Sequence, residues 1–357
     1  MKSQRRKSKP APPGPRASRA GLRIVALGGG TGLSALLRGL KEFTSLHPDH
    51  PARGHAPLSP SPIADLTAIV TVTDDGGSSG RLRREYRILP PGDIRNCMVA
   101  LADDEALLSR LFQYRFPPAE KGLGGHSFGN LFLTALTHVT GDFTEAVRVS
   151  GKVLAIRGRI FPSTLSNVTL EATLENGRRV RGETRISQSA ARIRRIALVP
   201  RNVRPLAEAL AAIAAADLIV LGPGSLYTSI LPNLLIPELA RAIARSKAPR
   251  VYIANLMTQP GETTGFTLAD HVRAIQEHTP GRVLDWVVAN HKVVSPAVAR
   301  RYRRQGAQQV LVDLPALQKL GLRAILDNLI EEHGVIRHDS HRLARLLLEE
   351  FSSPRLQ

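Results

Sequence analysis

Residues 22–43 read LRIVALGGGTGLSALLRGLKEF, and this stretch decides the fold class. The apolar run 22–27 predicts a buried strand, the glycines after it predict a turn, and the apolar spacing over 33–43 predicts a helix. A glycine turn of this kind lets backbone N–H groups approach an anion at the positive end of the helix. The turn lacks the third spaced glycine of a dinucleotide fingerprint and has no Walker lysine, so a tight turn without a ligand is an equally good interpretation.

Two further apolar runs end in the same kind of loop. Residues 66–72 read LTAIVTV and lead into TDDGGSSG, whereas LIVL at 218–221 leads into GPGS. The carboxyl ends of parallel strands meet at one edge of a sheet, where α/β proteins bind their ligands. Three such loops therefore favour a phosphorylated, nucleotide-like ligand, although Ser78 or Ser79 taken alone is explained as a helix cap.

The rest of the chain alternates between strand and helix patterns. Apolar strands separated by helices predict an α/β fold with a Rossmann-like, mostly parallel sheet covered by helices on both faces. The further predicted strands are 251–256, 286–289 and 310–312, and the clearest predicted helices are 127–139, 143–154, 205–213, 267–279, 295–305 and 339–351.

One segment breaks this alternation. Polar and apolar residues alternate over 168–175 and 178–187, on either side of an Asn-Gly pair at 176–177, which predicts a β-hairpin. With a third strand at 193–199 it forms a small antiparallel β insert. The chain thus divides into a disordered basic tail (1–21), one α/β domain (22–350) that contains the inserted subdomain (about 157–200) and a surface insertion (46–64), and a C-terminal tail (351–357).

The formal charge of +19 is concentrated in two segments. Residues 1–20 carry seven Lys and Arg and no acid, and residues 151–201 carry eleven against three acids. Such charge favours an anionic partner, but the chain is only 4% aromatic and offers little stacking surface for single-stranded bases. Nucleic-acid binding through the tail and the insert is therefore the least favoured function. The predicted ligand edge is expected to be locally positive through Arg81, Arg83 and Arg95.

Composition also limits which cellular compartment and which metal sites are expected. The single cysteine, Cys97, excludes a disulfide framework and a thiolate zinc site. The chain has no apolar run long enough for a membrane span, and its basic N-terminus lacks the apolar stretch of a signal peptide. We therefore expect a cytoplasmic protein, with a homodimer as the default assembly.

The loops and the segments near them supply the candidate site residues. Asp74 and Asp75 are suited to accept ribose hydroxyls or to hold Mg²⁺ against a phosphate, with Asp75 the candidate metal ligand. His126 fits a structural role at least as well as acid–base catalysis, and Asp93 is most simply a first-turn acid. The residues proposed to bind ligand or phosphate are Gly28, Gly29, Gly30, Thr31, Gly32, Asp74, Asp75, Gly76, Gly77, Ser78, Ser79, Arg95, Asn96, Asn130, Gly222, Gly224 and Ser225, and the weak catalytic candidates are Asp74, Asp75 and His126.

These motifs, taken together, resemble a known family. The chain is similar to the gluconeogenesis factor (YvcK-type) branch of the 2-phospho-L-lactate transferase (CofD-like) superfamily over roughly residues 22–350. The matching blocks are GGGTGL at 28–33, VTVTDDGGSSGRLR at 70–83, PGDIRN at 91–96, HSFGN at 126–130, GPGSLY at 222–227 and NLMTQPGET at 255–263. Several long blocks in the same order are far more specific than one glycine loop.

The resemblance implies a Rossmann-like core with an inserted subdomain, in a cytoplasmic protein needed for cell shape and for growth on gluconeogenic carbon sources. It also implies binding of UDP-sugars such as UDP-N-acetylglucosamine, with Tyr302 and Arg337 at the matching C-terminal positions. The transferase relatives move a phospholactyl group from a guanosine diphosphate donor to a deazaflavin with Mg²⁺. Here the second loop reads TDDGGSSG and not the Asn-Thr-Gly-Asp-Asp form of the transferases, which argues against the deazaflavin reaction.

Three functions remain open from the sequence. The favoured one is a non-catalytic regulator that binds a nucleotide-sugar and acts through unidentified protein partners. The second is a Mg²⁺-dependent, 2-phospho-L-lactate transferase-like enzyme that uses the same pocket, in which Mg²⁺ neutralises a leaving diphosphate. The third is the nucleic-acid-binding protein described above.

Overall fold

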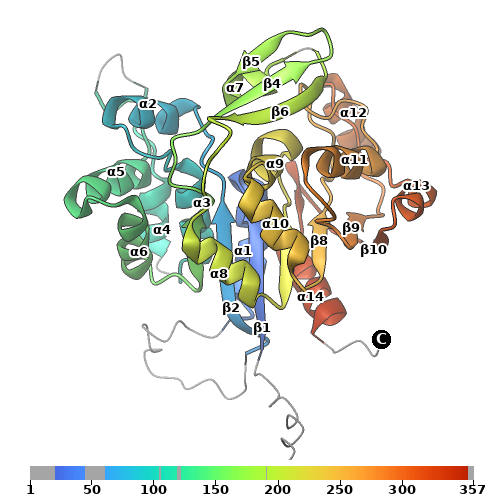
Figure 1. The fold of residues 1–357 in the computed structure, drawn as a ribbon, viewed down its shortest axis with the longest axis horizontal. Coiled ribbons are helices and arrows are strands. Elements are labelled where there is room, and N and C mark those ends of the chain that lie inside the picture. The colour runs from blue at the N-terminus through green and yellow to red at the C-terminus, as the bar shows by residue number, and fades with distance from the viewer. Residues whose placement is uncertain (1–20, 45–60, 104–105, 119–121, 190, 353–357) are drawn as a thin grey trace, which may run out of the picture.

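The computed structural model describes residues 21–44, 61–103, 106–118, 122–189 and 191–352 (Figure 1). The predicted tails at 1–21 and 351–357 and the insertion at 46–64 lie largely outside these residues. In the described part of the chain, no helix is both long and apolar enough to cross a bilayer.

The main sheet is parallel throughout, as the apolar strands predict. Its strands are β1 (Leu22–Gly28), β2 (Ile63–Val70), β3 (Arg159–Pro162), β7 (Leu218–Leu221), β8 (Arg250–Ile253), β9 (Trp286–Asn290) and β10 (Arg323–Asp327). The described strands pair in the order β10-β9-β8-β7-β1-β2-β3, each parallel to its neighbours. The α/β fold class is therefore confirmed, and the central strands are almost fully buried because helices cover both faces.

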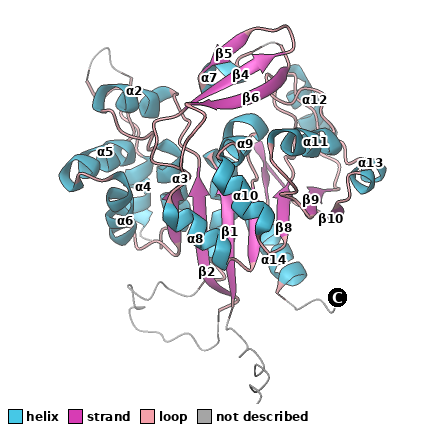
Figure 2. Cartoon of the chain, viewed as in Figure 1, coloured by secondary structure: helices cyan, strands magenta, loops and turns pink. Residues whose placement is uncertain are grey.

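The helices form two layers around this sheet (Figures 1 and 2). On one face α1 (Gly30–Lys41) packs against α3 (Gly92–Leu101) and α14 (Ser340–Phe351), and on the other α8 (Ala207–Ala215) packs against α10 (Pro237–Arg245). The α1–α14 contact is very close, since a Cβ at Gly39 would collide with the carbonyl of Ser340. Outside the insert, the remaining described helices are α2 (Gly77–Tyr86), α4 (Ala106–Gln113), α5 (Phe128–Thr140), α6 (Phe143–Val153), η1 (Leu226–Ile230), α9 (Leu231–Leu234), α11 (Leu268–His278), α12 (Pro296–Arg304) and α13 (Leu314–Lys319).

The insert forms a separate three-stranded antiparallel sheet above the main sheet in Figure 1. Its strands are β4 (Thr169–Leu174), β5 (Arg179–Arg181) and β6 (Ile193–Val199), paired in the order β5-β4-β6. The predicted second hairpin strand over 178–187 is wrong beyond Arg181, where the chain turns at Gly182 and forms the short helix α7 (Glu183–Ser187). Alternating polarity did not reveal this change because a single helical turn leaves no periodic signal.

The strand predicted at 310–312 is also wrong. Around these residues the structure has isolated bridges, Met257 with Gln309 and Thr267 with Leu311. The edge position belongs instead to β10, whose side chains are half-buried or exposed and therefore carry a weak apolar pattern. A two-stranded hairpin, β11 (Ile330–His333) with β12 (Val335–His338), was not predicted.

Candidate functional site

The three polar loops lie side by side at the carboxyl edge of the sheet. β7, β1 and β2 are adjacent, and the strand order reverses between β1 and β7. We call residues 28–32 the first loop, residues 73–80 the second loop and residues 222–225 the third loop. In open α/β sheets the crevice at such a reversal is where ligands bind. The prediction that these loops share one edge is confirmed.

The first and third loops touch through their backbones. A Cβ at Gly32 would lie 2.5 Å from the carbonyl oxygen of Pro223 and 2.9 Å from the Cα of Gly224. Gly30 differs, because its φ of +62° places it in the left-handed region and its Cβ would face open space, with only the Ser229 Oγ within 4 Å. Gly32 is thus required for packing, whereas Gly30 keeps the backbone open toward the crevice.

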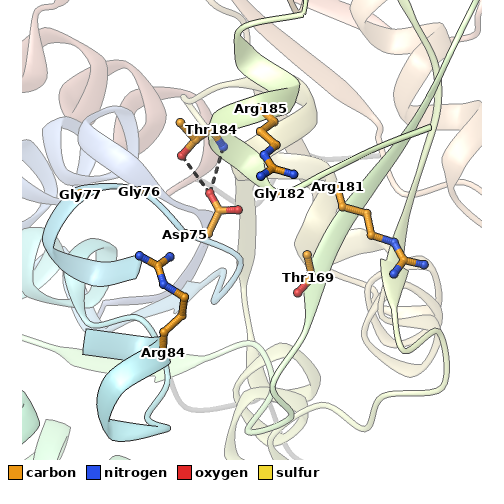
Figure 3. A pocket seen from close by; sticks show the side chains of 9 residues that line it. All are labelled: Asp75, Gly76, Gly77, Arg84, Thr169, Arg181, Gly182, Thr184 and Arg185. Atoms are coloured by element: carbon orange, nitrogen blue, oxygen red, sulfur yellow. Dashed lines mark hydrogen bonds between the residues drawn. The ribbon is translucent and has the colours of Figure 1, made fainter. Parts of the chain in front are cut away.

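The second loop anchors the insert through Asp75. One carboxylate oxygen, Oδ1, accepts hydrogen bonds from Thr184 N at 3.0 Å and Thr184 Oγ1 at 2.9 Å, so Asp75 binds the first turn of α7 (Figure 3). Asp74 Oδ1 accepts from the Gly76 N–H at 2.9 Å within the loop. One carboxylate oxygen of Asp75 therefore holds the insert against the second loop. The role of Asp75 in binding Mg²⁺ or ribose stays a prediction.

Ser78 and Ser79 lie in the first turn of α2, whose N-cap is Gly76, so the helix-cap role predicted for them is wrong, and both are buried in a polar cluster. Ser78 Oγ lies 3.0 Å from His126 Nδ1, and Asn130 Nδ2 donates to Ser78 Oγ at 3.1 Å. Burial of the ring and the nearby Arg81 cation lower the pKa of His126, which favours neutral imidazole. The contact with the Ser78 side chain supports a structural role for His126. Asn130 Oδ1 is buried and has no partner among the described residues.

Two carboxylates and one arginine meet beside the first loop. A Cβ at Gly29 would lie 2.6 Å from Asp93 Oδ2, and one at Gly92 would lie 2.9 Å from Asp74 Oδ2. Burial, reinforced by the Asp74 charge, raises the pKa of Asp93 to about 7, although Asp93 accepts a hydrogen bond from the Gly30 N–H. Asp93 is therefore more than a first-turn acid, because it already engages an amide of the first loop.

Arg95 supplies the buried cation of this group. Burial, followed by repulsion from Arg115, lowers its pKa, while Asp93 and Asp74 oppose that shift. Its Nη2 donates to Asn96 Oδ1 at 2.6 Å, and its Nε is buried without a partner in the described part of the chain. A buried donor with no partner is costly, so Arg95 Nε is a group that a ligand oxygen would stabilise.

The other two arginines expected at this edge bind the fold itself. Arg83 donates to Asn167 Oδ1 and to the Val168 carbonyl at the entry to the insert. Arg81 Nη2 donates to the Gly124 carbonyl at 2.6 Å. Both guanidinium groups keep their positive charge, but the donors engaged with these neutral oxygens are not available to a ligand.

Two glutamates near the loops were missed by sequence reasoning. Glu262 is 5% exposed and accepts from Tyr227 N at 3.1 Å, Thr228 Oγ1 at 2.9 Å and Ser187 Oγ at 3.3 Å. It thus links the helix after the third loop to α7. Glu183 of α7 accepts from Thr73 Oγ1 at 3.3 Å, and burial together with Asp93 raises its pKa well above the usual range. The block at 255–263 contains Glu262 and offered a signal, whereas nothing in the insert marked Glu183.

Tyr302 and Arg337 lie on neighbouring elements near the end of β8. The Tyr302 hydroxyl accepts from the Ile336 N–H at 3.0 Å, and its ring packs with Leu256, Met257 and Ile336. Arg337 follows on β12 with an exposed side chain, and His338 lies 3.1 Å from the Ala254 carbonyl. Tyr302 thus contacts the residue that precedes Arg337, and the part of both residues in sugar-nucleotide binding stays a prediction.

The Tyr302 hydroxyl allows a first test. Tyr302→Phe removes the acceptor of the Ile336 N–H and is expected to lower the free energy of unfolding by about 1 kcal/mol. Urea unfolding measures this loss, and Tyr114→Phe, at an exposed tyrosine, is the control. Equal stability of the two variants would show that the hydroxyl does not hold the hairpin.

A parallel α/β sheet whose three glycine-containing loops meet where the strand order reverses defines the class of protein, and comparison with known proteins defines the family. The family model described as 2-phospho-L-lactate transferase CofD matches residues 24–330. The chain belongs to this CofD family and, within it, to the gluconeogenesis factors.

Individual relatives match along almost their whole length. The gluconeogenesis factor of Bacillus subtilis is 46% identical over 328 residues, which cover 92% of this chain and 97% of the relative. That of Halalkalibacterium halodurans is 45% identical over 327 residues, covering 91% and 95%. The crystal structure of a UPF0052 family member from Bacillus halodurans superposes with a TM-score of 0.83 at 44% identity, covering 92% of this chain and 99% of that one.

Proposed function

We propose that this protein is a cytoplasmic regulator that binds a UDP-sugar, of the UDP-N-acetylglucosamine type, and supports cell shape and growth on gluconeogenic carbon sources. The observation that carries the binding proposal is the meeting of three glycine-containing loops at the switch point between β1 and β7. Gly30 keeps the backbone open there, and Arg95 offers a buried donor without a partner. The regulatory part rests on kinship with proteins named gluconeogenesis factors.

A diphosphate suits the mixed electrostatics of this crevice. Arg95 and the amino end of α1 favour an anion, whereas the carboxylates of Asp74 and Asp93 oppose one unless they accept ligand hydroxyls. Ribose and sugar hydroxyls are donors to such carboxylates. A nucleotide-sugar combines both kinds of group in one molecule, which is why it fits better than inorganic phosphate alone.

Gly30→Val tests the position of the ligand. The valine side chain would extend into the open space at Gly30, and we expect UDP-N-acetylglucosamine affinity, measured by calorimetry, to fall at least tenfold. The matched control is Gly321→Val, because Gly321 has a similar left-handed φ of +73° and open surroundings but lies just before the amino end of β10. Both variants carry the same backbone strain. Equal affinities of the two variants for UDP-N-acetylglucosamine would therefore show that the ligand does not bind at the first loop.

A transferase is the second candidate function, and the positions of two carboxylates near the first loop favour it. Asp93 of α3 contacts the first loop, and Asp74 of the second loop lies against the neighbouring Gly92. In the described residues no group of three or more His, Cys, Asp or Glu side chains is arranged to hold a metal ion. Mg²⁺ often takes only one or two protein carboxylates plus phosphate oxygens, and Asp74 with Asp93 fits that mode.

When bound there, Mg²⁺ would supply charge neutralisation for a leaving diphosphate. Asp74 and Asp93 would hold the ion, while Arg95 would orient the phosphates. The deciding experiment is turnover of a panel of nucleotide-linked donors by the purified protein with Mg²⁺. Turnover that Asp74→Asn abolishes would establish the transferase, and no turnover across the panel would leave binding as the function.

A further inference from the structure

A pocket lies between the core and the insert, next to the second loop and apart from the first and third loops. It encloses about 370 Å³ and is lined by Asp75, Gly76, Gly77, Arg84, Thr169, Arg181, Gly182, Thr184 and Arg185 (Figure 3). None of these residues comes from the first or third loop, and Asp74, Asp93 and Glu183 are absent from the lining. The pocket is therefore a neighbour of the crevice and shares only residues 75–77 with the second loop.

The lining carries more positive than negative charge. Figure 3 shows Arg84 of α2 and Arg185 of α7 on either side of Asp75, with both guanidinium groups directed toward the pocket, whereas Arg181 is directed outward. Arg181 is already paired with Glu171 at 2.6 Å. Asp75 is the one acid in the lining, and one of its carboxylate oxygens already accepts hydrogen bonds from Thr184. Arg84 and Arg185 thus face a shared space with only partial neutralisation.

Part of the lining is bare backbone. A Cβ at Gly77 would have no heavy atom within 4 Å, whereas one at Gly182 would collide with Asp75 Oδ2, so the open stretch is at Gly77. Bare backbone lets a ligand come within hydrogen-bonding distance, and two forked guanidinium groups match the oxygens of a phosphate group. The volume is at the lower end of the range for small-molecule sites.

We propose that this pocket binds the phosphate group of a second small molecule, held by Arg84 and Arg185. An anion there bridges α2 of the core and α7 of the insert and relieves the repulsion between the two arginines. Because α7 also contacts Thr73 and Glu262 beside the crevice, an occupied pocket fixes the insert over the nucleotide-sugar site. The ligand is a phosphorylated metabolite distinct from the nucleotide-sugar, and its binding regulates that site.

The test uses inorganic phosphate as the probe, at constant ionic strength, with the increase of the melting temperature as readout. We expect Arg84→Gln and Arg185→Gln each to raise the phosphate concentration needed for half the stabilisation at least fivefold. Arg178→Gln is the control, because Arg178 is an exposed arginine of the same insert that does not line the pocket. The full chain is used throughout.

A second measurement tests whether inorganic phosphate binds in the proposed pocket or in the nucleotide-sugar site. With UDP-N-acetylglucosamine at saturation, the wild-type response to inorganic phosphate is expected to persist. Loss of that response would place the phosphate in the nucleotide-sugar site and overturn the proposal. Phosphate stabilisation that is unchanged in both arginine variants would overturn it too. If the nucleotide-sugar does not bind at all, the first arm still decides, so failure of the proposed function is distinguishable from failure of this inference.

Discussion

Gly32→Ala is expected to lower the free energy of unfolding by about 2–3 kcal/mol and to abolish nucleotide-sugar binding. The added methyl would lie 2.5 Å from the carbonyl oxygen and 2.8 Å from the carbonyl carbon of Pro223. Both are backbone atoms of the third loop, so relief requires the first and third loops to separate. Alanine in place of glycine ordinarily stabilises a helix interior by about 1 kcal/mol, so a net loss at this position within α1 measures the close contact.

The matched control comes from the same loop. In Gly28→Ala the new methyl would meet the Leu33 Cβ at 3.4 Å, an ordinary contact, and Gly28 needs no left-handed φ. We expect its stability to stay within about 1 kcal/mol of wild type. Urea unfolding followed by circular dichroism compares the two variants. If both lose the same stability, the contact between the loops does not hold the crevice together.

The motif loops were the part of the site most accessible to sequence reasoning. Strand runs that end in glycines at 28–32, 73–80 and 222–225 are local patterns, and parallel strands bring such ends to one edge. The structure confirms the shared edge and adds that β7, β1 and β2 are adjacent, which the sequence did not predict. What a local pattern does not contain is the use of each side chain after folding.

The contacts of the second loop show why the remainder was not predictable. Asp75 reaches Thr184, 109 residues further along the chain, and Arg83 reaches Asn167, 84 residues away. Both partners lie in or beside the insert, whose placement over the loops depends on tertiary packing. The helix α7 also depends on a distant residue, because Asp75 of the second loop accepts a hydrogen bond from the Thr184 N–H in its first turn.

Asp93 makes the stability of the protein depend on pH in a defined direction. Burial raises the pKa of Asp93 to about 7, above the value near 3.9 of an unfolded aspartate. The folded state therefore holds this proton more tightly, and stability is lost as the pH rises from about 4 through 7. For Asp93 alone, these values imply a loss of roughly 2–3 kcal/mol between pH 5 and pH 8.

Asp93→Asn removes this dependence while keeping an oxygen acceptor for the Gly30 N–H. Relative to wild type, the variant is expected to gain roughly 2–3 kcal/mol of unfolding free energy between pH 5 and pH 8. The variant also lacks the charge repulsion of Asp93 with Glu183 and Asp74, and this loss of repulsion adds to the gain in unfolding free energy. Urea unfolding at the two pH values measures the gain.

The same proton links stability to anion binding. A protonated Asp93 places no negative charge beside the first loop, so the affinity for a diphosphate ligand is expected to rise as the pH falls from 8 to 6, and to rise less in Asp93→Asn. Glu277→Gln, which removes an exposed carboxylate on α11, is the control and should follow wild type in both measurements. Parallel stability curves for wild type and Asp93→Asn would mean that Asp93 is already ionised at pH 5, and the carboxylate would then oppose the ligand at every pH tested.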